Sequence, residues 1–303
     1  MSHSTRRRHR ALGYATMTLT LVPLALAGLP ATASGNSAAF GQPGPLAVSR
    51  TGQVYVASGR ELYRLNGDRP VPVAKAAGTI ECVVASDSGA IYLGERDQLQ
   101  KVSPTGHVSV VTRAHVTGLG RGPQGSTYVV TNAAVSRLVN QQLVPVVRRS
   151  QFVGVSHVPT QISALTFANV ALDAHGNTYI TASGIGFSLF EVTRSGNVRY
   201  IGPARAGGSP ASMTEGPGGR VYIGVQNSIL TADAGHLGGF RSFAAGAVKG
   251  LTGALAPRYI AASTAPGSPL YADADGQNGF SNDAAIVRIN SDHRVVTLWS
   301  HAA

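Results

Sequence analysis

The chain has 303 residues, a formal net charge of +11 at pH 7, 43% hydrophobic residues and one cysteine. The lone Cys82 excludes an internal disulfide, so packing alone must hold the fold together. The basic residues are mostly arginines scattered singly along the chain, without a basic patch or interleaved stacking aromatics. We therefore expect no nucleic-acid binding.

Residues 1–33 have the three parts of a secretory signal peptide. Four arginines lie between positions 6 and 10, residues 11–29 are uncharged and mostly apolar, and Ala31-Thr-Ala33 fits a small-x-small cleavage pattern. The segment predicts a secreted protein cleaved after Ala33, with no stable membrane span afterwards. Whether export uses the general or the twin-arginine route stays open.

Cleavage would leave 270 residues, which is enough for one large domain. Without the four leader arginines, the 25 basic and 14 acidic residues give a net charge of +7. We expect a linker over residues 34–45, a single domain over residues 46–303, and a monomer.

A short phrase, a glycine turn followed by a tyrosine in an apolar run, occurs six times. Its glycine and tyrosine positions are Gly52/Tyr55, Gly89/Tyr92, Gly125/Tyr128, Gly176/Tyr179, Gly219/Tyr222 and, with one extra residue, Gly267/Tyr271. A repeat period of roughly 35 to 50 residues is typical of propellers and solenoids, because one repeat unit cannot bury its faces alone.

Each repeat divides into four short strands when period-two alternation is read with turn residues as boundaries. The pattern predicts an all-β fold, a six-bladed β-propeller with four-stranded antiparallel blades. A third-strand position follows each glycine by 12 residues in repeats one, two, three and five, by 15 in repeat four and by 21 in repeat six. We place the extra residues between strands two and three. The third-strand positions are Arg64, Lys101, Arg137, Glu191, Thr231 and Arg288.

These features resemble the six-bladed propellers built from NHL-type repeats, whose consensus has a turn, Gly-x-Val-Tyr-Val, and an apolar-x-Arg-apolar strand. The resemblance covers residues 40 to 300 and implies the fold. It does not define a function, because related propellers include sensor domains, virginiamycin B lyase-like enzymes, gluconolactonase-like hydrolases and plain binding proteins.

Length variation among the repeats falls on one rim, where the strand two to three loops and the strand four to one connections open. Function concentrates on loops held by a rigid scaffold, although neutral drift of surface loops is the alternative. We therefore expect a binding module with its site on this rim, at the channel mouth, for an extracellular protein, a glycan or a small molecule. The candidate ligand-binding residues are Arg148, Arg149, His157, Gln161, Asn169, Lys249 and Arg258.

Residues 273–283 gather carboxylates and amides around glycine, which suits a hard cation such as calcium. The candidate metal ligands are Asp273, Asp275 and Asp283. The EF-hand spacing is absent, and a solvated loop is the alternative interpretation. No other cofactor is expected.

An enzyme is the competing hypothesis. Gluconolactonase-like propellers hold a divalent metal at the starts of inner strands, where Glu81 and Asn169 stand, although a third acidic ligand is missing. His157 with Glu81 would be a catalytic pair for virginiamycin B lyase-like chemistry. The alternative function is thus a metal-dependent hydrolase or lyase. How the ring closes is left open, with residues 37–42 as a candidate closing strand.

Overall fold

The computed structural model divides into two units, Met1–Ala38 and Ala39–Ala303. It describes residues 40, 42–184, 186–206, 209–210, 212–225, 228–232, 241–245, 257–275 and 284–301. The second unit contains every described element, and the expected leader lies outside the described residues.

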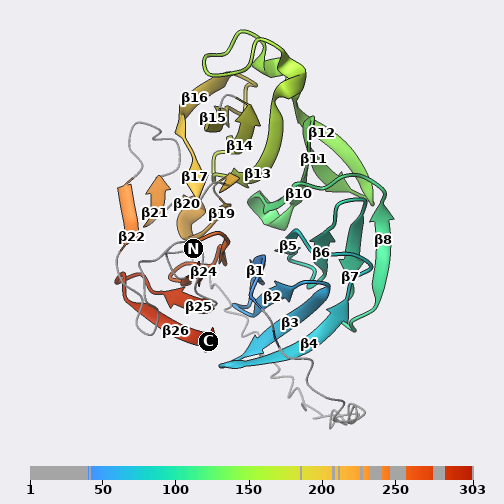
Figure 1. Cartoon of the computed structure of the whole chain (residues 1–303), viewed down its shortest axis with the longest axis vertical. Coiled ribbons are helices and arrows are strands. Elements are labelled where there is room, and N and C mark those ends of the chain that lie inside the picture. The colour runs from blue at the N-terminus through green and yellow to red at the C-terminus, as the bar shows by residue number, and fades with distance from the viewer. Residues whose placement is uncertain are drawn as a thin grey trace, which may run out of the picture. The chain divides into compact units, whose positions relative to one another are not determined.

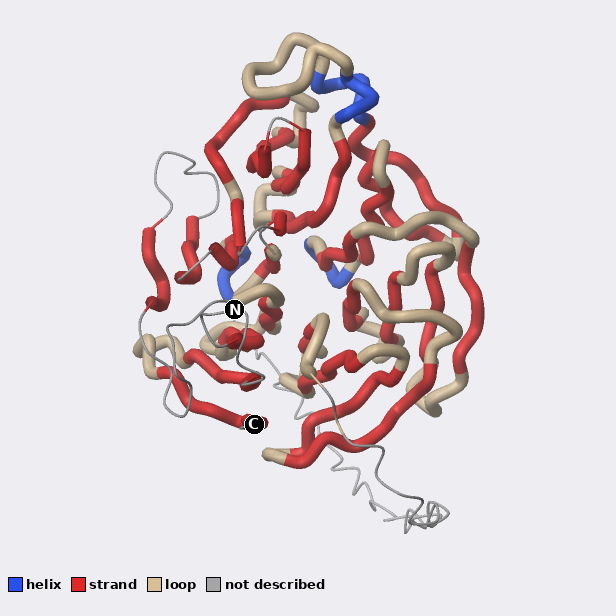
Figure 2. The backbone as a smooth tube through the Cα atoms, viewed as in Figure 1, coloured by secondary structure: helices blue, strands red, loops and turns tan. Residues whose placement is uncertain are grey.

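The described strands form six four-stranded antiparallel sheets, numbered here as blades in chain order (Figures 1 and 2). Blade 1 consists of β1 (Leu46–Val48), β2 (Val54–Ser58), β3 (Glu61–Asn66) and β4 (Arg69–Lys75). Blade 2 consists of β5 (Cys82–Ala85), β6 (Ile91–Gly94), β7 (Leu99–Val102) and β8 (Val108–Thr112). Blade 3 consists of β9 (Gly118–Arg121), β10 (Thr127–Thr131), β11 (Ala134–Val139) and β12 (Gln142–Arg148).

The remaining blades follow the same order. Blade 4 consists of β13 (Thr166–Leu172), β14 (Thr178–Gly184), β15 (Gly186–Val192) and β16 (Val198–Pro203). Blade 5 consists of β19 (Met213–Glu215), β20 (Val221–Val225), β21 (Ser228–Ala232) and β22 (Arg241–Ala245), after a two-stranded hairpin of β17 (Arg205–Ala206) and β18 (Ser209–Pro210). Blade 6 consists of β23 (Ile260–Ala262), β24 (Leu270–Asp275), β25 (Ala284–Ile289) and β26 (Val295–His301). Short 3₁₀ turns are η1 (Pro123–Gly125), η2 (Arg149–Phe152), η3 (Ile162–Ala164) and η4 (Pro217–Gly219).

The first strand of each blade lies at the centre of the ring and contacts the first strands of both neighbouring blades, including β1 with β23 (Figure 1). The chain is therefore a six-bladed β-propeller, as its repeats predict. The inner strands begin on one face, which we call the long-loop face. They end on the other, which we call the short-turn face, where the strand one to two and three to four turns lie.

The repeat tyrosine has the same partner in every blade. It lies directly across the ladder from the third-strand position, as in Tyr55 with Arg64 and Tyr179 with Glu191. The other four pairs are Tyr92/Lys101, Tyr128/Arg137, Tyr222/Thr231 and Tyr271/Arg288. All six repeat glycines have positive φ, between 69° and 83°, because the tight turn needs a left-handed residue. The spacing of the repeat thus sets the register of the blades.

In blade 4 the extra residues do not lie where we expected them. We predicted that they lie in the loop between strands two and three, but β14 and β15 are each seven residues long and a single residue joins them. Additional ladder pairs, from Ala182 with Ser188 to Gly184 with Gly186, use the inserted residues as strand. This extension forms because pairing satisfies backbone groups that a loop would leave to water.

A phenylalanine at the seam between blades 1 and 6 answers how the ring closes. Each blade is built from four consecutive strands, and no described strand from the N-terminal segment joins blade 6. Instead, the Phe40 ring makes edge-on contacts with Tyr63 of β3 (4.9 Å between centroids) and Trp299 of β26 (4.6 Å). Aromatic packing by Phe40 therefore contributes to this seam beside the contact of β1 with β23. Of the candidate closing strand over residues 37–42, the structure describes residues 40 and 42, and neither is in a strand.

Candidate functional site

The cavity among the first strands is too small for a substrate. The first strands line the central channel mainly with apolar side chains and leave a cavity of about 40 Å³. That volume holds water, whereas pockets for small molecules measure roughly 300–1,000 Å³. A ligand site on the described part of the ring must therefore lie over a blade, between blades, or outside the channel on one face.

The long connection from β12 to β13 was expected to carry ligand-binding residues, and the structure shows how it is held. Phe152 is fully buried and packs against Phe167 and Phe190, at 5.0 and 5.3 Å between ring centroids. The Nη1 atom of Arg149 donates hydrogen bonds to the carbonyl oxygens of Ser163 (2.8 Å) and Leu165 (3.0 Å). The guanidinium of Arg149, at the start of this connection, thus binds the backbone at the end of the same connection.

The other candidate ligand-binding residues of this connection do not converge on one site. His157 stacks on Tyr200 of β16, the outermost strand of blade 4, with the ring centroids 3.9 Å apart. Arg148 and Gln161 are exposed. Glu81 stands before β5 in blade 2, so blade 3 separates it from His157. The structure does not bring together the Glu81 and His157 pair of the enzyme hypothesis.

Two candidates from different predicted sets bind each other in blade 6. Asp273 is fully buried, and its Oδ1 accepts hydrogen bonds from the backbone N–H groups of Arg258 (2.9 Å) and Tyr259 (2.5 Å). Its Oδ2 lies 3.7 Å from the Nε of Arg258. The proposed metal ligand therefore holds the start of β23 in place. The backbone N–H of Asn169, in β13, donates to the hydroxyl oxygen of Thr181 (3.2 Å).

The remaining metal candidates fall largely outside the description. Asp283, the side chain of Asp275, and the ligand candidate Lys249 lie outside the described residues. Within the described part of the chain, no three His, Cys, Asp or Glu side chains gather as a metal site would require. A calcium site at residues 273–283 stays a prediction.

A polar pocket of about 620 Å³, which we call the blade-2 pocket, opens on the long-loop face over blade 2. The connection from β4 to β5, the loop from β6 to β7, and Arg113 after β8 form its walls. Its charged lining residues are Glu81, Glu95, Asp97, Arg96 and Arg113. The pocket thus contains Glu81, one residue of the enzyme hypothesis, together with two carboxyl groups that our sequence interpretation missed.

Glu95 is the buried member of this pocket, with 4% of its surface exposed. Its Oε2 accepts hydrogen bonds from the backbone N–H of Gly78 (2.7 Å) and the side-chain amide of Gln98 (3.2 Å). A Cβ on Gly78 would lie 2.8 Å from this oxygen, so the glycine permits the close approach. Oε1 is buried with no hydrogen bond to the described residues. Glu95 is therefore oriented at one oxygen, while its other oxygen has no hydrogen-bond partner among the described residues.

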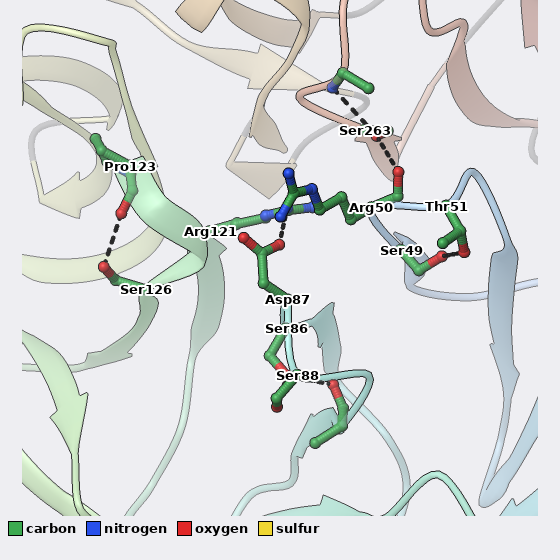
Figure 3. Close-up of polar contacts among 12 residues, drawn as sticks. Ser49, Arg50, Thr51, Ser86, Asp87, Ser88, Arg121, Pro123, Ser126 and Ser263 are labelled. Atoms are coloured by element: carbon green, nitrogen blue, oxygen red, sulfur yellow. Dashed lines mark hydrogen bonds and ion pairs between the residues drawn. The ribbon is translucent and has the colours of Figure 1, made fainter. Parts of the chain in front are cut away.

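The opposite mouth of the channel, on the short-turn face, contains a buried charged cluster (Figure 3). Arg121, the last residue of β9, has a 7% exposed side chain and forms an ion pair with Asp87, which follows β5. The side chain of Arg50 extends from blade 1 toward this pair, and the Arg50 carbonyl accepts a hydrogen bond from Ser263 of blade 6 (3.3 Å). The ion pair joins blades 2 and 3, and the hydrogen bond joins blades 1 and 6.

Glu215, the last residue of β19, completes the charged cluster and is 6% exposed. Burial, together with the carboxylates of Asp173 and Asp87, raises the pKa of Glu215 to about 7 against the attraction of Arg121. Asp173 is itself fully buried and accepts four hydrogen bonds, from His175, Tyr179 and, twice, Asn177. Glu215 Oε2 and Arg121 Nη1 have no hydrogen bond to described groups. Because the adjoining cavity admits only water, this cluster closes the mouth.

The sequence carries a signal for this cluster. Arg121 and Glu215 are the only charged residues within the six inner strands. Each begins the same pattern, Arg121-Gly-Pro-Gln-Gly125 and Glu215-Gly-Pro-Gly-Gly219. A charge at the end of an apolar inner strand predicts a buried polar group that needs a partner.

The fold is similar to that of solved enzymes at low identity. Virginiamycin B lyase from Staphylococcus aureus, in a catalytically inactive form with quinupristin, is 14% identical over 86% of this chain and 85% of that chain, with a TM-score of 0.55. A gluconolactonase from Xanthomonas campestris is 11% identical over 83% and 80%, with a TM-score of 0.52. The PQQ-bound aldose sugar dehydrogenase of Streptomyces coelicolor is 13% identical over 82% and 93%, with a TM-score of 0.53.

These likenesses show the fold and not the activity, because propellers with a common architecture carry unrelated functions. No protein-family model matches the sequence, and no curated protein matches it significantly. In the described residues, none of the helices has the length and apolar character needed to cross a bilayer.

Proposed function

We propose that this chain is a secreted binding module and that the blade-2 pocket, on the long-loop face, takes a short peptide or an amino-acid-like zwitterion. The observation that carries the proposal is Glu95, a buried carboxyl group oriented by Gly78 and Gln98 with one oxygen left without a hydrogen bond. A buried carboxyl oxygen that lacks a partner is costly unless a ligand or water supplies one.

The mixed charge of the lining indicates the chemistry of the ligand. Carboxyl groups of Glu81, Glu95 and Asp97 suit an amino group, and the guanidinium groups of Arg96 and Arg113 suit a carboxylate. No aromatic side chain is among the described residues of this lining, so stacking contributes nothing here. A ligand with both charges would satisfy both kinds of group.

Isothermal titration of the mature chain with glycylglycine tests the proposal. Ethylamine and acetate serve as probes that carry only one of the two charges. We expect saturable binding of the dipeptide, weaker binding of either single-charge probe, and a loss of at least about tenfold in affinity for Glu95→Gln. Arg113→Ala, at an exposed position, should weaken the binding of the dipeptide without affecting the binding of ethylamine.

The matched control is Glu61→Gln, which removes a partly exposed carboxylate that pairs with Lys75 on blade 1 and is not among the described residues lining the pocket. Its affinity for glycylglycine should equal that of the wild type. Absence of dipeptide binding, or equal binding by Glu95→Gln, would overturn the proposal.

The second candidate function is a metal-dependent hydrolase or lyase, because the fold is shared with a lyase and a gluconolactonase. Glu81, Glu95 and Asp97 line one pocket but are not gathered as a metal site among the described residues, so a bound metal would have to draw them together. Thermal melting with chelator, followed by calcium, zinc or magnesium, tests it, because a metal that binds only the folded state raises the melting temperature. A rise that Glu81→Gln abolishes would favour the enzyme. An unchanged melting temperature would leave the binding module.

A further inference from the structure

A second pocket lies between blades 5 and 6 on the short-turn face, opposite the face of the blade-2 pocket. We call it the interblade groove. It has a volume of about 470 Å³, which is within the usual range for small-molecule sites. Its walls come from the turn before β20, the start of β22, and the two turns of blade 6. Two adjacent blades therefore build it together.

Three rings form a continuous aromatic wall in this groove. Tyr222, which is 4% exposed, meets Phe243 edge-on with ring centroids 5.0 Å apart. The ring of Phe243 lies 4.9 Å from the ring of His293 across the boundary between the blades. A Cβ on Gly216 would approach the Tyr222 ring to 2.5 Å, so the glycine makes room for this ring. Because Tyr222 is buried, the partly exposed ring of Phe243 supplies the apolar surface that a flat ligand face can cover, with Tyr222 packed behind it.

The His293 side chain has a defined hydrogen-bonding state. Its Nδ1 lies 2.6 Å from the carbonyl oxygen of Phe243. A carbonyl only accepts, so Nδ1 carries the hydrogen and, in the neutral ring, Nε2 is an acceptor. His293 also has a φ of +66°, which is uncommon outside glycine. The turn therefore holds this imidazole at the groove in one orientation.

The rest of the rim is rich in hydroxyl groups and poor in charge. Ser242, Ser268 and Ser291 contribute hydroxyls, each of which can donate and accept, and Arg220 contributes the one charged side chain among the described lining residues. No carboxylate lines the described part of the groove. The groove thus differs in chemistry from the blade-2 pocket, which has charges of both signs and no aromatic residue.

We propose that the interblade groove binds a neutral sugar of one or two rings. A pyranose has an apolar C–H face, which the ring of Phe243 can cover, and a rim of hydroxyls that both donate and accept. The serine hydroxyls and the Nε2 of His293 match that rim. The described lining contains no carboxylate that would pair with a cation, and a volume of about 470 Å³ accommodates two sugar rings. This site is independent of the blade-2 pocket and does not rest on the function proposed for it.

Titration calorimetry of the mature chain with maltose and with cellobiose tests the proposal. At least one of these disaccharides should bind with a dissociation constant no weaker than millimolar. Phe243→Ala and His293→Ala should each lower the affinity for that disaccharide by about tenfold or more. Ser291→Arg, at an exposed turn position, should block the groove and abolish binding while the melting temperature stays unchanged.

The matched control is His107→Ala. His107 is an exposed histidine in the corresponding third-to-fourth strand turn of blade 2, away from the groove. Its affinity should equal that of the wild type. The proposal is overturned if neither disaccharide binds the wild type, or if a binding disaccharide binds Ser291→Arg as tightly as the wild type. The glycylglycine titration can succeed or fail separately, because it depends on residues of the opposite face.

Discussion

On the long-loop face, several charged side chains are exposed or bonded to nearby backbone, as Arg148 and Arg149 are. On the short-turn face, Arg121 and Glu215 are withdrawn into the channel mouth, where each has a polar atom without a hydrogen bond to the described residues. Loop length and charge burial therefore vary independently in this ring. Both faces bury charge, but differently: the long-loop face holds Glu95 and Asp273 against backbone N–H groups, whereas the short-turn face pairs Arg121 with Asp87 beside Glu215.

The largest expected effect is on the short-turn face. Asp87→Asn removes the partner of the buried Arg121 guanidinium and should lower the free energy of unfolding by about 3 kcal/mol, because an unpaired buried charge is costly. Urea unfolding measures the change. The control is Asp292→Asn, which breaks the exposed pair with Arg294, where the side chains are 55% and 82% exposed. It should leave the stability nearly unchanged, since solvent screens such pairs. Equal effects of the two substitutions would contradict the difference that we draw between the mouth and the surface.

Glu215 should make the stability of the chain fall as the pH rises. Its folded-state pKa of about 7 is above the ordinary carboxyl value of 4.5, so the folded state keeps its proton where the unfolded state loses it. The stabilisation is complete below about pH 4.5 and disappears through about pH 7, a change on the order of 3 kcal/mol.

Glu215→Gln, which mimics the protonated acid, should match the wild type at pH 4.5 and exceed it in melting temperature at pH 8. Thermal melts at both pH values give the comparison. A wild type and variant with parallel pH profiles would show that Glu215 does not titrate in this range.

A smaller effect is expected on the long-loop face, from two adjacent arginines. Arg149→Ala removes two hydrogen bonds to backbone carbonyls of the β12–β13 connection and should cost about 1–2 kcal/mol of unfolding free energy. Arg148→Ala changes an exposed neighbour and should cost little. Urea unfolding of both variants separates a structural arginine from a free one. If Arg149→Ala were silent and Arg148→Ala destabilising, our assignment of the two roles would be reversed.

Sequence alone predicted the architecture well because the repeat ties a left-handed glycine, a strand tyrosine and a cross-strand partner to fixed spacings. These spacings predict the register of the tyrosine in all six blades and the division of the chain into four-stranded blades. Loop contents were less predictable. An insertion of a few residues can extend a ladder, as in blade 4, or form a loop, and the backbone spacing is the same in both cases.

The candidate site was predictable only in part. Glu81 lies in the blade-2 pocket, but Glu95 and Asp97 come from a four-residue loop of ordinary length, so loop-length variation could not reveal them. Asp273 and Arg258 were assigned to different tasks because nothing in the sequence shows that residues 15 apart meet at the start of an inner strand. The charges at the ends of β9 and β19 were visible in the sequence, and their exceptional position among apolar inner strands was the usable signal.

The boundary between blades 6 and 1, where Phe40 packs, is the place where the ring should open most easily. Five of the six boundaries between blades are crossed by the backbone, which passes from an outer strand to the next inner strand, while the boundary between blades 6 and 1 depends on side chains such as Phe40, Tyr63 and Trp299. A fluctuation that separates these rings opens the circle without breaking any strand pair. Amide protons of β1 and β23 should therefore exchange with deuterium sooner than those of β9 and β13, and a covalent tether across the seam would slow them.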